Sequence, residues 1–319
     1  MLTLVCGGFG AARFLSGLRE VVDTPLCCVV NTADDLEYAG LQVCPDLDSV
    51  LYALVGEFDE QRGFGRRRDT FRCNEELTRY GAGWFSVGDE DLALHLERTR
   101  LLQTGMSLSE VTAHIAAAWG SPARLLPMSD DPVRTVVRTD VGSLSFNDFL
   151  VRRRASPRVI GVRYDGIAQA APAPGVLEAL RDADVVLIAP SNPVSSVAPL
   201  LALPGVLQSL SDRRKPTVAV TPVVSGREPQ TGPERVRAQV RAALMAALGL
   251  PHRATVVAGL YGQWLDGFVL DERDSAEQAE IGVPVLLADT LAEPGPRRTQ
   301  LARAVLEFAY GVSGKAPLI

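Results

Sequence analysis

The first turn of the chain has the residue types of an anion-binding loop. An apolar, β-prone run at residues 2–6 is followed by a glycine-rich bend at residues 7–10 and then by helical spacing of apolar residues over 11–18. Glycine lets a backbone come close to a ligand, and the first N–H groups of a helix have no partner inside it. We therefore expect phosphate at this turn, with Arg13 as the nearby cation. The alternative is a sharp turn in which glycine serves packing alone.

Carboxylates and an amide follow the next apolar run. Residues 26–30 predict a second buried strand, and Asn31, Asp34 and Asp35 come directly after it. The two strands and the helix between them make a βαβ unit, in which both strand ends lie at one edge of a parallel sheet. We expect these polar side chains to lie beside the glycine turn, in the crevice where open α/β sheets bind ligands.

Two more carboxylates fall in the first turn of a predicted helix. Pro45 lies where the helix starts, and Asp46 and Asp48 follow it. Carboxylates at this place can be simple N-caps. Beside Asp34 and a phosphate, however, they would repel the ligand unless a hard divalent cation lay between them. This argument favours a Mg²⁺ site.

Three further polar segments are candidates for the same site. Arginines cluster within residues 62–72, either on a solvated helix face or in an anion-binding loop. Residues 128–131 are a polar loop between apolar strands, with a plain turn as the alternative. Ser191 begins a polar turn after the predicted buried strand 183–189, so it is expected at the carboxyl edge.

The rest of the chain alternates strands and helices, which predicts an α/β fold. Helices are expected at 50–56, 74–80, 89–104, 108–119, 233–249 and 297–310. Strands are expected at 123–126, 133–138, 143–149, 183–189, 216–221, 254–258, 265–269 and 283–287, and residues 226–232 are expected to be a loop. No linker divides the chain, so we expect one domain over 1–319. Its region at about 50–150 forms a helical excursion with a small antiparallel sheet, placed as a cap over the carboxyl edge.

Composition narrows the class of protein. The 319 residues are 47% hydrophobic and 22% charged, and the net charge of −6 argues against a general nucleic-acid surface. No apolar run approaches the ~20 residues that span a bilayer. The five cysteines have no metal-ligand spacing, and the three histidines are scattered, so neither a histidine metal site nor a catalytic triad is indicated. We expect a cytoplasmic protein with buried, reduced thiols and with no membrane or nucleic-acid partner.

Read in order, these segments resemble one family, the 2-phospho-L-lactate transferases (CofD/FbiA). The resemblance is carried by NTADDLEYAGLQVCPDLDSVLYAL, RGFGRRRDTF, VGDEDLALH, LLPMSDDPV, APSNPVSSVAPLLALPGV and FVLDERD, and it covers nearly the whole chain. It implies a modified Rossmann-like sheet, usually in a homodimer, and a Mg²⁺-dependent transferase of coenzyme F-420 biosynthesis. Such enzymes move a phospho-(three-carbon acid) group from a guanosine diphosphate-linked donor to the ribityl hydroxyl of the deazaflavin FO, and they release GMP.

The resemblance also implies roles for individual residues. The donor nucleotide and its phosphates are assigned to Gly7, Gly8, Gly10, Arg13, Asn31, Asp34, Ser191 and Asn192. FO is assigned to Asp48, Ser86, Met128, Ser129 and Asp130. Asp46 and Asp48 are the expected catalytic and metal-binding pair, with Asp48 next to the ribityl chain as a candidate general base. The arginines at 62–68 are expected to frame the entrance.

The chain departs from the family pattern at the phosphate end. Phe9 stands where the family turn has a small hydroxyl residue, Arg13 stands for a lysine, and Ser86 stands where some relatives have a basic residue. These changes leave the transferred acid open between lactyl, enolpyruvyl and glyceryl. Two alternatives follow: a transferase with another nucleotide-activated donor, and a non-catalytic nucleotide-binding regulator.

Overall fold

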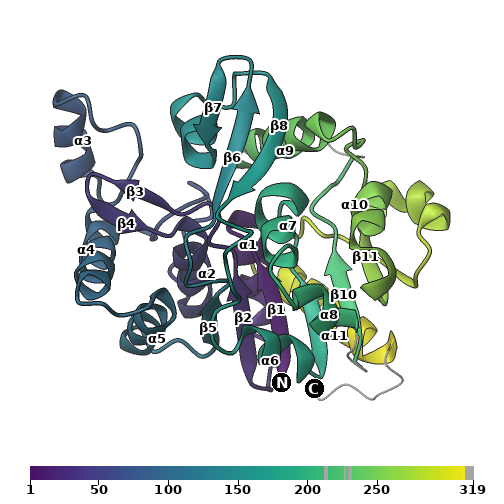
Figure 1. Cartoon of the computed structure of the whole chain (residues 1–319). Coiled ribbons are helices and arrows are strands. Elements are labelled where there is room, and N and C mark those ends of the chain that lie inside the picture. Colours follow the sequence, from purple (N-terminus) through teal and green to yellow (C-terminus); the bar gives the residue numbers. More distant parts are fainter. Residues whose placement is uncertain (212–214, 226–227, 229–231, 313–319) are drawn as a thin grey trace.

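A seven-stranded sheet, parallel throughout, forms the centre of the computed structural model (Figure 1). The structure describes residues 1–211, 215–225, 228 and 232–312. The strands are β1 Leu2–Cys6, β2 Leu26–Val30, β5 Arg124–Pro127, β9 Val185–Ile188, β10 Thr217–Val220, β11 Gly267–Asp271 and β12 Val285–Ala288. The predicted α/β fold with a parallel sheet is confirmed.

The first strand occupies the middle of the sheet. The order of strands is β12–β11–β10–β9–β1–β2–β5, so the chain first builds outward from β1 through β2 to β5 and then returns to its other side at β9. The direction of winding therefore reverses between β1 and β9. In open α/β sheets ligands bind at this switch point, outside the carboxyl ends of the strands.

Helices cover both faces of the sheet because the strands are apolar on both sides. Leu4 and Cys6 of β1 point into one core with helices α1 Phe9–Leu18, α2 Pro45–Val55 and α11 Pro296–Val312. Alternate residues such as Val5 point into the other core. The elements of that second face are α6 Val176–Arg181, η2 Pro193–Val197, α7 Ala198–Leu201, α8 Val206–Ser211, α9 Gly232–Ala247 and α10 Ala254–Tyr261.

The excursion between β2 and β5 is mostly helical, as predicted. A hairpin of β3 Leu36–Tyr38 and β4 Leu41–Val43 precedes α2, and the helices α3 Arg72–Arg79, α4 Asp89–Gln103 and α5 Leu108–Ala118 follow it. In Figure 1 the hairpin, α3 and α4 lie to one side of the sheet. The short hairpin was not predicted from the sequence.

A small antiparallel sheet stands over the carboxyl edge of the large one (Figure 1). Its strands are β6 Arg134–Thr139, β7 Gly142–Ser145 and β8 Val159–Asp165, in the order β7–β6–β8. The hydroxyl of Tyr164 on β8 donates to the carbonyl of Val194 in η2, which ties the small sheet to the body.

Two predicted strands are corrected by the structure. Residues 254–258 form the start of α10 rather than a strand, because a short apolar run without polar alternation has no period that separates the two structures. The predicted strand 143–149 ends at Ser145, and the π-helix η1 Asp148–Arg152 follows. The strand β8 was missed. Most of the predicted loop 226–232 lies outside the described residues.

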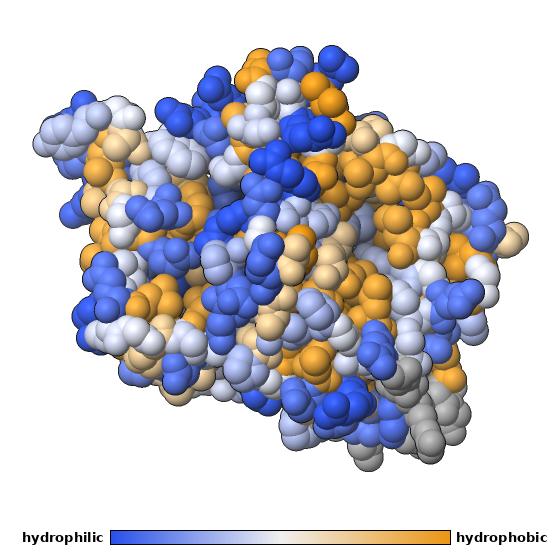
Figure 2. Space-filling model, viewed as in Figure 1, coloured by the Kyte–Doolittle hydropathy of each residue, from blue (hydrophilic) through white to orange (hydrophobic). Residues whose placement is uncertain are grey.

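The visible surface mixes polar and apolar side chains. On the face shown in Figure 2, hydrophobic residues gather around α10, whose Leu260 is exposed; Leu248, just after α9, is exposed as well. In the described part of the chain, no helix is long and apolar enough to cross a membrane.

Close packing accounts for the glycines of the first turn. A Cβ on Gly10 would lie 1.9 Å from the carbonyl oxygen of Pro190, and a Cβ on Gly7 would lie 2.6 Å from Ser196. The turn after β1 therefore touches the turn after β9 directly, backbone against backbone. Only a residue without a side chain permits this approach.

We predict that Gly10→Ala destabilises the fold, because the new methyl group meets a carbonyl that cannot move without displacing β9. The expected loss is about 1–3 kcal/mol in the free energy of unfolding, measured in urea. Gly259→Ala in α10 is the matched control, since a Cβ there meets nothing within 4 Å; it should stabilise the helix by about 0.5–1 kcal/mol. Equal stability of the two variants would contradict this explanation.

Candidate active site

A cavity of about 330 Å³ opens at the switch point, where the turns after β1 and β9 meet. The start of α2, the α3–α4 segment, η1 and α9 complete its wall. The sequence-predicted residues that line it are Gly8, Gly10, Arg13, Asp34, Asp46, Asp48, Ser86, Ser191 and Asn192. Segments far apart in sequence are thus brought to one site, because the carboxyl ends of parallel strands meet at one edge of the sheet.

Gly7 and Asn31 lie behind this wall and hold it in place. The N–H of Gly7 donates to the hydroxyl of Ser191 at 2.8 Å, which joins the two glycine-side turns. The amide of Asn31 donates to Oδ2 of Asp46 at 2.9 Å, and its oxygen accepts the N–H of Ala33 at 3.1 Å. Both residues act on the site through their neighbours.

The loop at Met128–Asp130 does not line the cavity. Met128 is fully buried in the core, and the hydroxyl of Ser129 donates to the carbonyl of Ala171. Asp130 accepts two hydrogen bonds from Ser109 in the first turn of α5, at 2.6 and 2.8 Å. Contact of these side chains with FO would require the loop to move, and their assignment to FO stays a prediction.

Helix N-termini face the cavity from two turns. Helix α1 starts at Phe9, and its N-cap residue, Gly8, provides no side-chain cap. At the second turn, Oδ1 of Asn192 accepts the N–H groups of Val194 and Ser195, at 2.9 and 3.3 Å. Asn192 thus caps η2, whereas the first turn of α1 keeps N–H groups that its own helix cannot satisfy. Those groups suit an anion.

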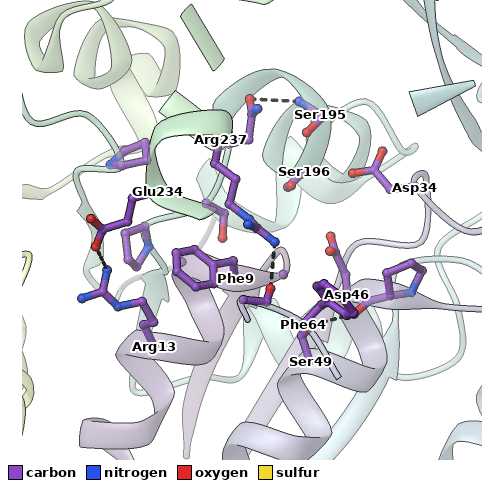
Figure 3. A pocket seen from close by; sticks show the side chains of 18 of the residues that line it. Phe9, Arg13, Asp34, Asp46, Ser49, Phe64, Ser195, Ser196, Glu234 and Arg237 are labelled. Carbon is purple, nitrogen blue, oxygen red and sulfur yellow. Dashed lines mark hydrogen bonds and ion pairs between the residues drawn. The ribbon is translucent and has the colours of Figure 1, made fainter. Parts of the chain in front are cut away.

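Two carboxylates, the buried Asp34 and the half-buried Asp46, lie on one side of the cavity (Figure 3). Burial raises the pKa of Asp46 to about 6, while the Asn31 amide and the charge of Arg237 oppose the rise. Burial and then the charge of Asp46 raise the pKa of Asp34 well above its usual range. A Cβ on Gly8 would lie 2.4 Å from Oδ1 of Asp46. Asp46 therefore sits directly against the glycine turn.

Asp48 has a different environment, since a guanidinium holds it. Arg98 of α4 binds Oδ1 of Asp48 through one nitrogen and Oδ2 through the other, the second at 3.2 Å. Nδ1 of His95 lies 3.2 Å from Arg98 and 3.7 Å from Asp48. Because arginine can only donate, Nδ1 of His95 is an acceptor and its proton sits on Nε2. Burial lowers the pKa of His95 to about 4.

The surroundings of the three carboxylates indicate which of them could coordinate the expected Mg²⁺. The described residues contain no cluster of three or more histidine, cysteine or acidic side chains that could hold a metal. Mg²⁺ in phosphate sites, however, needs only one or two carboxylates besides substrate oxygens and water. Asp46 fits, and so does Asp34, whose buried Oδ1 has no hydrogen-bond partner in the described part. Asp48 fits poorly, since Arg98 occupies both of its oxygens.

The sequence patterns predicted only one of the cations discussed next, Arg13, as a site residue. Arg13 lines the cavity but binds Glu234 at 2.5 Å, so its charge is already paired (Figure 3). Arg237 and Arg241 of α9 also line the cavity. Burial lowers the pKa of each to about 10. Their four-residue spacing within an amphipathic helix was the available signal.

None of the clustered arginines at 62–72 lines the cavity. Of this segment, only Gly63, Phe64 and Gly65 belong to the lining. Arg62 stacks on the ring of Phe71, with 4.3 Å from its guanidinium carbon to the ring centroid, and Arg66 stacks on Trp119 at 4.6 Å. These arginines cover aromatic rings rather than frame the cavity.

The other end of the cavity is apolar and aromatic. Its lining there includes Phe64, Phe85, Val87, Phe146 and Leu150. Such walls suit a flat heterocycle. Asn147, beside Phe146, donates to the carbonyl of Asp34 at 2.6 Å, so the small sheet is anchored at the acid pair.

A further polar pair, Tyr52 and Asp91, belongs to this wall. The hydroxyl of Tyr52 donates to Oδ1 of Asp91 at 2.6 Å. Asp91 is 5% exposed, and burial raises its pKa to about 6. A Cβ on Gly65 would lie 2.8 Å from Oδ2 of Asp91. The sequence analysis assigned neither residue.

Comparison with known proteins agrees with this geometry. The family model described as "2-phospho-L-lactate transferase CofD" matches residues 2–285. The chain belongs to the CofD family. As a member of this family it is a transferase, and the sequence resemblance stated above is confirmed. Among its relatives is the phosphoenolpyruvate transferase of Streptomyces griseus, 40% identical over 98% of this chain and 99% of the relative.

Archaeal relatives carry a different name. The 2-phospho-L-lactate transferase of Methanosarcina acetivorans is 39% identical over 98% of both chains, and that of Methanopyrus kandleri is 39% identical over 98% of this chain and 99% of the relative. Among solved structures, a UPF0052 family protein from Bacillus halodurans has a TM-score of 0.62 at 16% identity, over 96% of this chain and 99% of that one. This last likeness concerns the fold alone.

We predict that Asp48→Ala destabilises the protein by about 3–5 kcal/mol, because it leaves the buried Arg98 charge without its partner. The free energy of unfolding in urea is the measurement. The double variant Asp48→Ala/Arg98→Leu should recover a large part of the loss. A single variant as stable as the wild type would show that the pair does not hold α4 against α2.

The raised pKa of Asp91 predicts a pH effect on stability. Below about pH 4 the carboxyl is protonated in both folded and unfolded chains; between about pH 4 and 6 only the unfolded chain releases the proton. Proton release lowers the free energy of the unfolded state relative to the folded state, so the free energy of unfolding falls as pH rises through this window. Asp91→Asn should reduce the loss between pH 4 and 7 by about 2 kcal/mol, measured by urea unfolding at each pH. Parallel pH profiles would contradict the assignment.

Proposed function

We propose that this protein transfers a phospho-(three-carbon acid) group from a guanosine diphosphate-linked donor to FO, with release of GMP. Membership of the CofD family supports the class of reaction. The observation that carries the proposal within the chain is the contact of Asp46 with Gly8 at the switch point. It puts an acidic pair, an uncapped helix N-terminus and a cationic helix around one cavity large enough for both substrates' reacting ends.

The donor's diphosphate is assigned to the glycine turn. Gly8 and Gly10 line the cavity at the start of α1, where free N–H groups favour an anion. Ser191, fixed by the N–H of Gly7, presents its side chain from the opposite turn. Asn192 contributes by starting η2 at this place.

FO is assigned to the aromatic end. Phe64, Phe85 and Phe146 offer faces and edges to a planar ring system. Ser86, and the carboxylates Asp48 and Asp91 beyond it, offer acceptors for the hydroxyls of a ribityl chain. This order places the end of the ribityl chain between the aromatic wall and the phosphates.

The transfer itself forms one bond and breaks one. The ribityl hydroxyl oxygen attacks the phosphorus that carries the acid, the bond from that phosphorus to the bridging oxygen breaks, and GMP leaves with that oxygen. Asp48 accepts the hydrogen bond and then the proton of the attacking hydroxyl, and Arg98 fixes the orientation of its carboxylate. Positioning and charge neutralisation, rather than covalent catalysis, supply the rate enhancement of such a transfer.

Mg²⁺ is proposed at Asp46 together with Asp34, in place of the expected pair of Asp46 and Asp48. The fit rests on the raised pKa values of both carboxylates and on the unpartnered Oδ1 of Asp34. When bound, the ion would neutralise charge on the donor's phosphate oxygens. Asn31 would orient Asp46 toward it.

A homodimer and a cytoplasmic location are also proposed. The apolar face around α10 supports self-association, because large exposed apolar patches mark contact surfaces (Figure 2). Light scattering measures this directly. The free cysteines, of which Cys6, Cys27, Cys28 and Cys44 are buried, support a reducing compartment.

We predict that the purified protein converts FO when given Mg²⁺ and the guanosine diphosphate-linked form of enolpyruvate, lactate or glycerate, with products read by mass spectrometry. Asp46→Asn should lower turnover by about 100-fold or more, because the carboxylate nearest the phosphates is lost. Asp165→Asn removes an exposed carboxylate on β8 and is the control. Absence of transfer from all three donors would refute the proposal.

A further inference from the structure

Helix α9 turns one polar face toward the cavity. Its residues Glu234, Arg237, Ala238 and Arg241 all line the cavity, and their spacing of three and four places them on one side of the helix. Glu234 binds Arg13, so the charge at the start of this face is paired. The two later residues, both arginines, differ in this respect.

Uncharged groups hold Arg237. Its guanidinium donates to the carbonyl of Gly63 at 2.8 Å and to that of Pro233 at 3.3 Å, and it lies 4.4 Å from the centre of the Phe9 ring. In Figure 3 the side chain reaches from α9 over Phe9 toward Asp46. No carboxylate of the described residues forms an ion pair with it. Phe9, which replaces the small hydroxyl residue expected at this turn, therefore serves as a platform for a cation.

A histidine holds Arg241. Nε of Arg241 donates to Nε2 of His252 at 3.0 Å. Since arginine only donates, Nε2 of His252 is the acceptor and the imidazole carries its proton on Nδ1. The contact fixes the plane of the guanidinium, and among the described residues no hydrogen bond engages its two terminal nitrogens. Arg241, too, forms no ion pair with a carboxylate of the described residues.

Two neighbouring arginines, Arg298 in the lining and Arg98 behind it, show the contrast. Arg98 binds Asp48 and Arg298 binds Glu60. A partly buried guanidinium held only by neutral groups keeps its full charge available, and placing it there is costly unless an anion joins it. Two such groups, one helical turn apart on the wall of a cavity, indicate a ligand with two anionic groups.

We propose that Arg237 and Arg241 form the cationic half of the donor site, with Arg237 binding the diphosphate beside the glycine turn and Arg241 binding the next oxyanion of the same molecule. That oxyanion is a second phosphate or the carboxylate of the three-carbon acid. The inference rests on the proposed function for the identity of the donor. The positive charge for the donor's phosphates then comes from α9, because the charge of Arg13 is paired with Glu234.

The test is equilibrium binding of inorganic pyrophosphate, GDP and the guanosine diphosphate-linked acid, by calorimetry, to the full chain and to single variants. Arg237→Gln and Arg241→Gln should each weaken binding by about tenfold or more. Arg235→Gln, on the exposed side of the same helix, removes the same charge and should leave affinity unchanged. FO binding, measured by fluorescence, should be equal in all four proteins.

Two further comparisons sharpen the result. A loss with Arg241→Gln for both GDP and the complete donor assigns Arg241 to phosphate, whereas a loss for the complete donor alone assigns it to the carboxylate. Arg237→Lys and Arg241→Lys keep the charge without the planar fork and cover the case of a misfolded glutamine variant, since they should still bind more weakly than the wild type.

The inference is overturned if the glutamine variants, shown folded by thermal denaturation, bind all three ligands within about twofold of the wild type, or if the wild type binds none of them. Failure of the proposed function looks different. A wild type that binds pyrophosphate and GDP in an arginine-dependent way, yet transfers nothing to FO, would refute the reaction and keep the anion site.

Discussion

The close contact between the turns after β1 and β9 is the constraint on which the site depends. Gly10 lies against the carbonyl of Pro190, and Gly7 donates to Ser191, so the two strands at the switch point end in one continuous surface. Every other part of the site is placed relative to it. Asp46 packs on Gly8 from α2, and Arg237 reaches over Phe9 from α9. Glycine is therefore needed for packing and, by the same geometry, exposes the helix N-terminus to a ligand.

Electrostatics divide the cavity into unlike parts. Asp34 and Asp46 form an acidic side, whose pKa values are raised above all by burial. Arg237 and Arg241 form a basic side. Asp48 and Arg98 neutralise each other deeper in the wall and keep the geometry fixed. A donor that carries both phosphates and a divalent ion complements such a division, since each side then gains the charge that it lacks.

The sequence predicted the parts of the site that follow directly from strand ends. Apolar runs in the sequence predict buried strands. Residues that directly follow such strands, such as Asn31 and Ser191, lie at the carboxyl edge because the strands are parallel. It could not predict Arg237, Arg241 or the Asp48–Arg98 pair, because a helix pattern does not state which neighbour its polar face meets. The side chains of Met128–Asp130 do not line the cavity, since a polar loop after a strand can turn its side chains inward to cap a helix, and their contact with FO stays a prediction. The strand predicted at 254–258 was wrong, because its short apolar run shows neither helical nor strand periodicity.

The central place of β1 has a consequence for how the molecule is made. Leu2 pairs with Val185, and α1 packs on α11, so segments that are synthesised early wait for segments that are synthesised much later. Long-range parallel pairing of this kind is slow, and an unpaired apolar strand is prone to aggregate. A nascent chain that ended before β9 would expose one side of β1 and would lack the turn after β9 that lines the cavity.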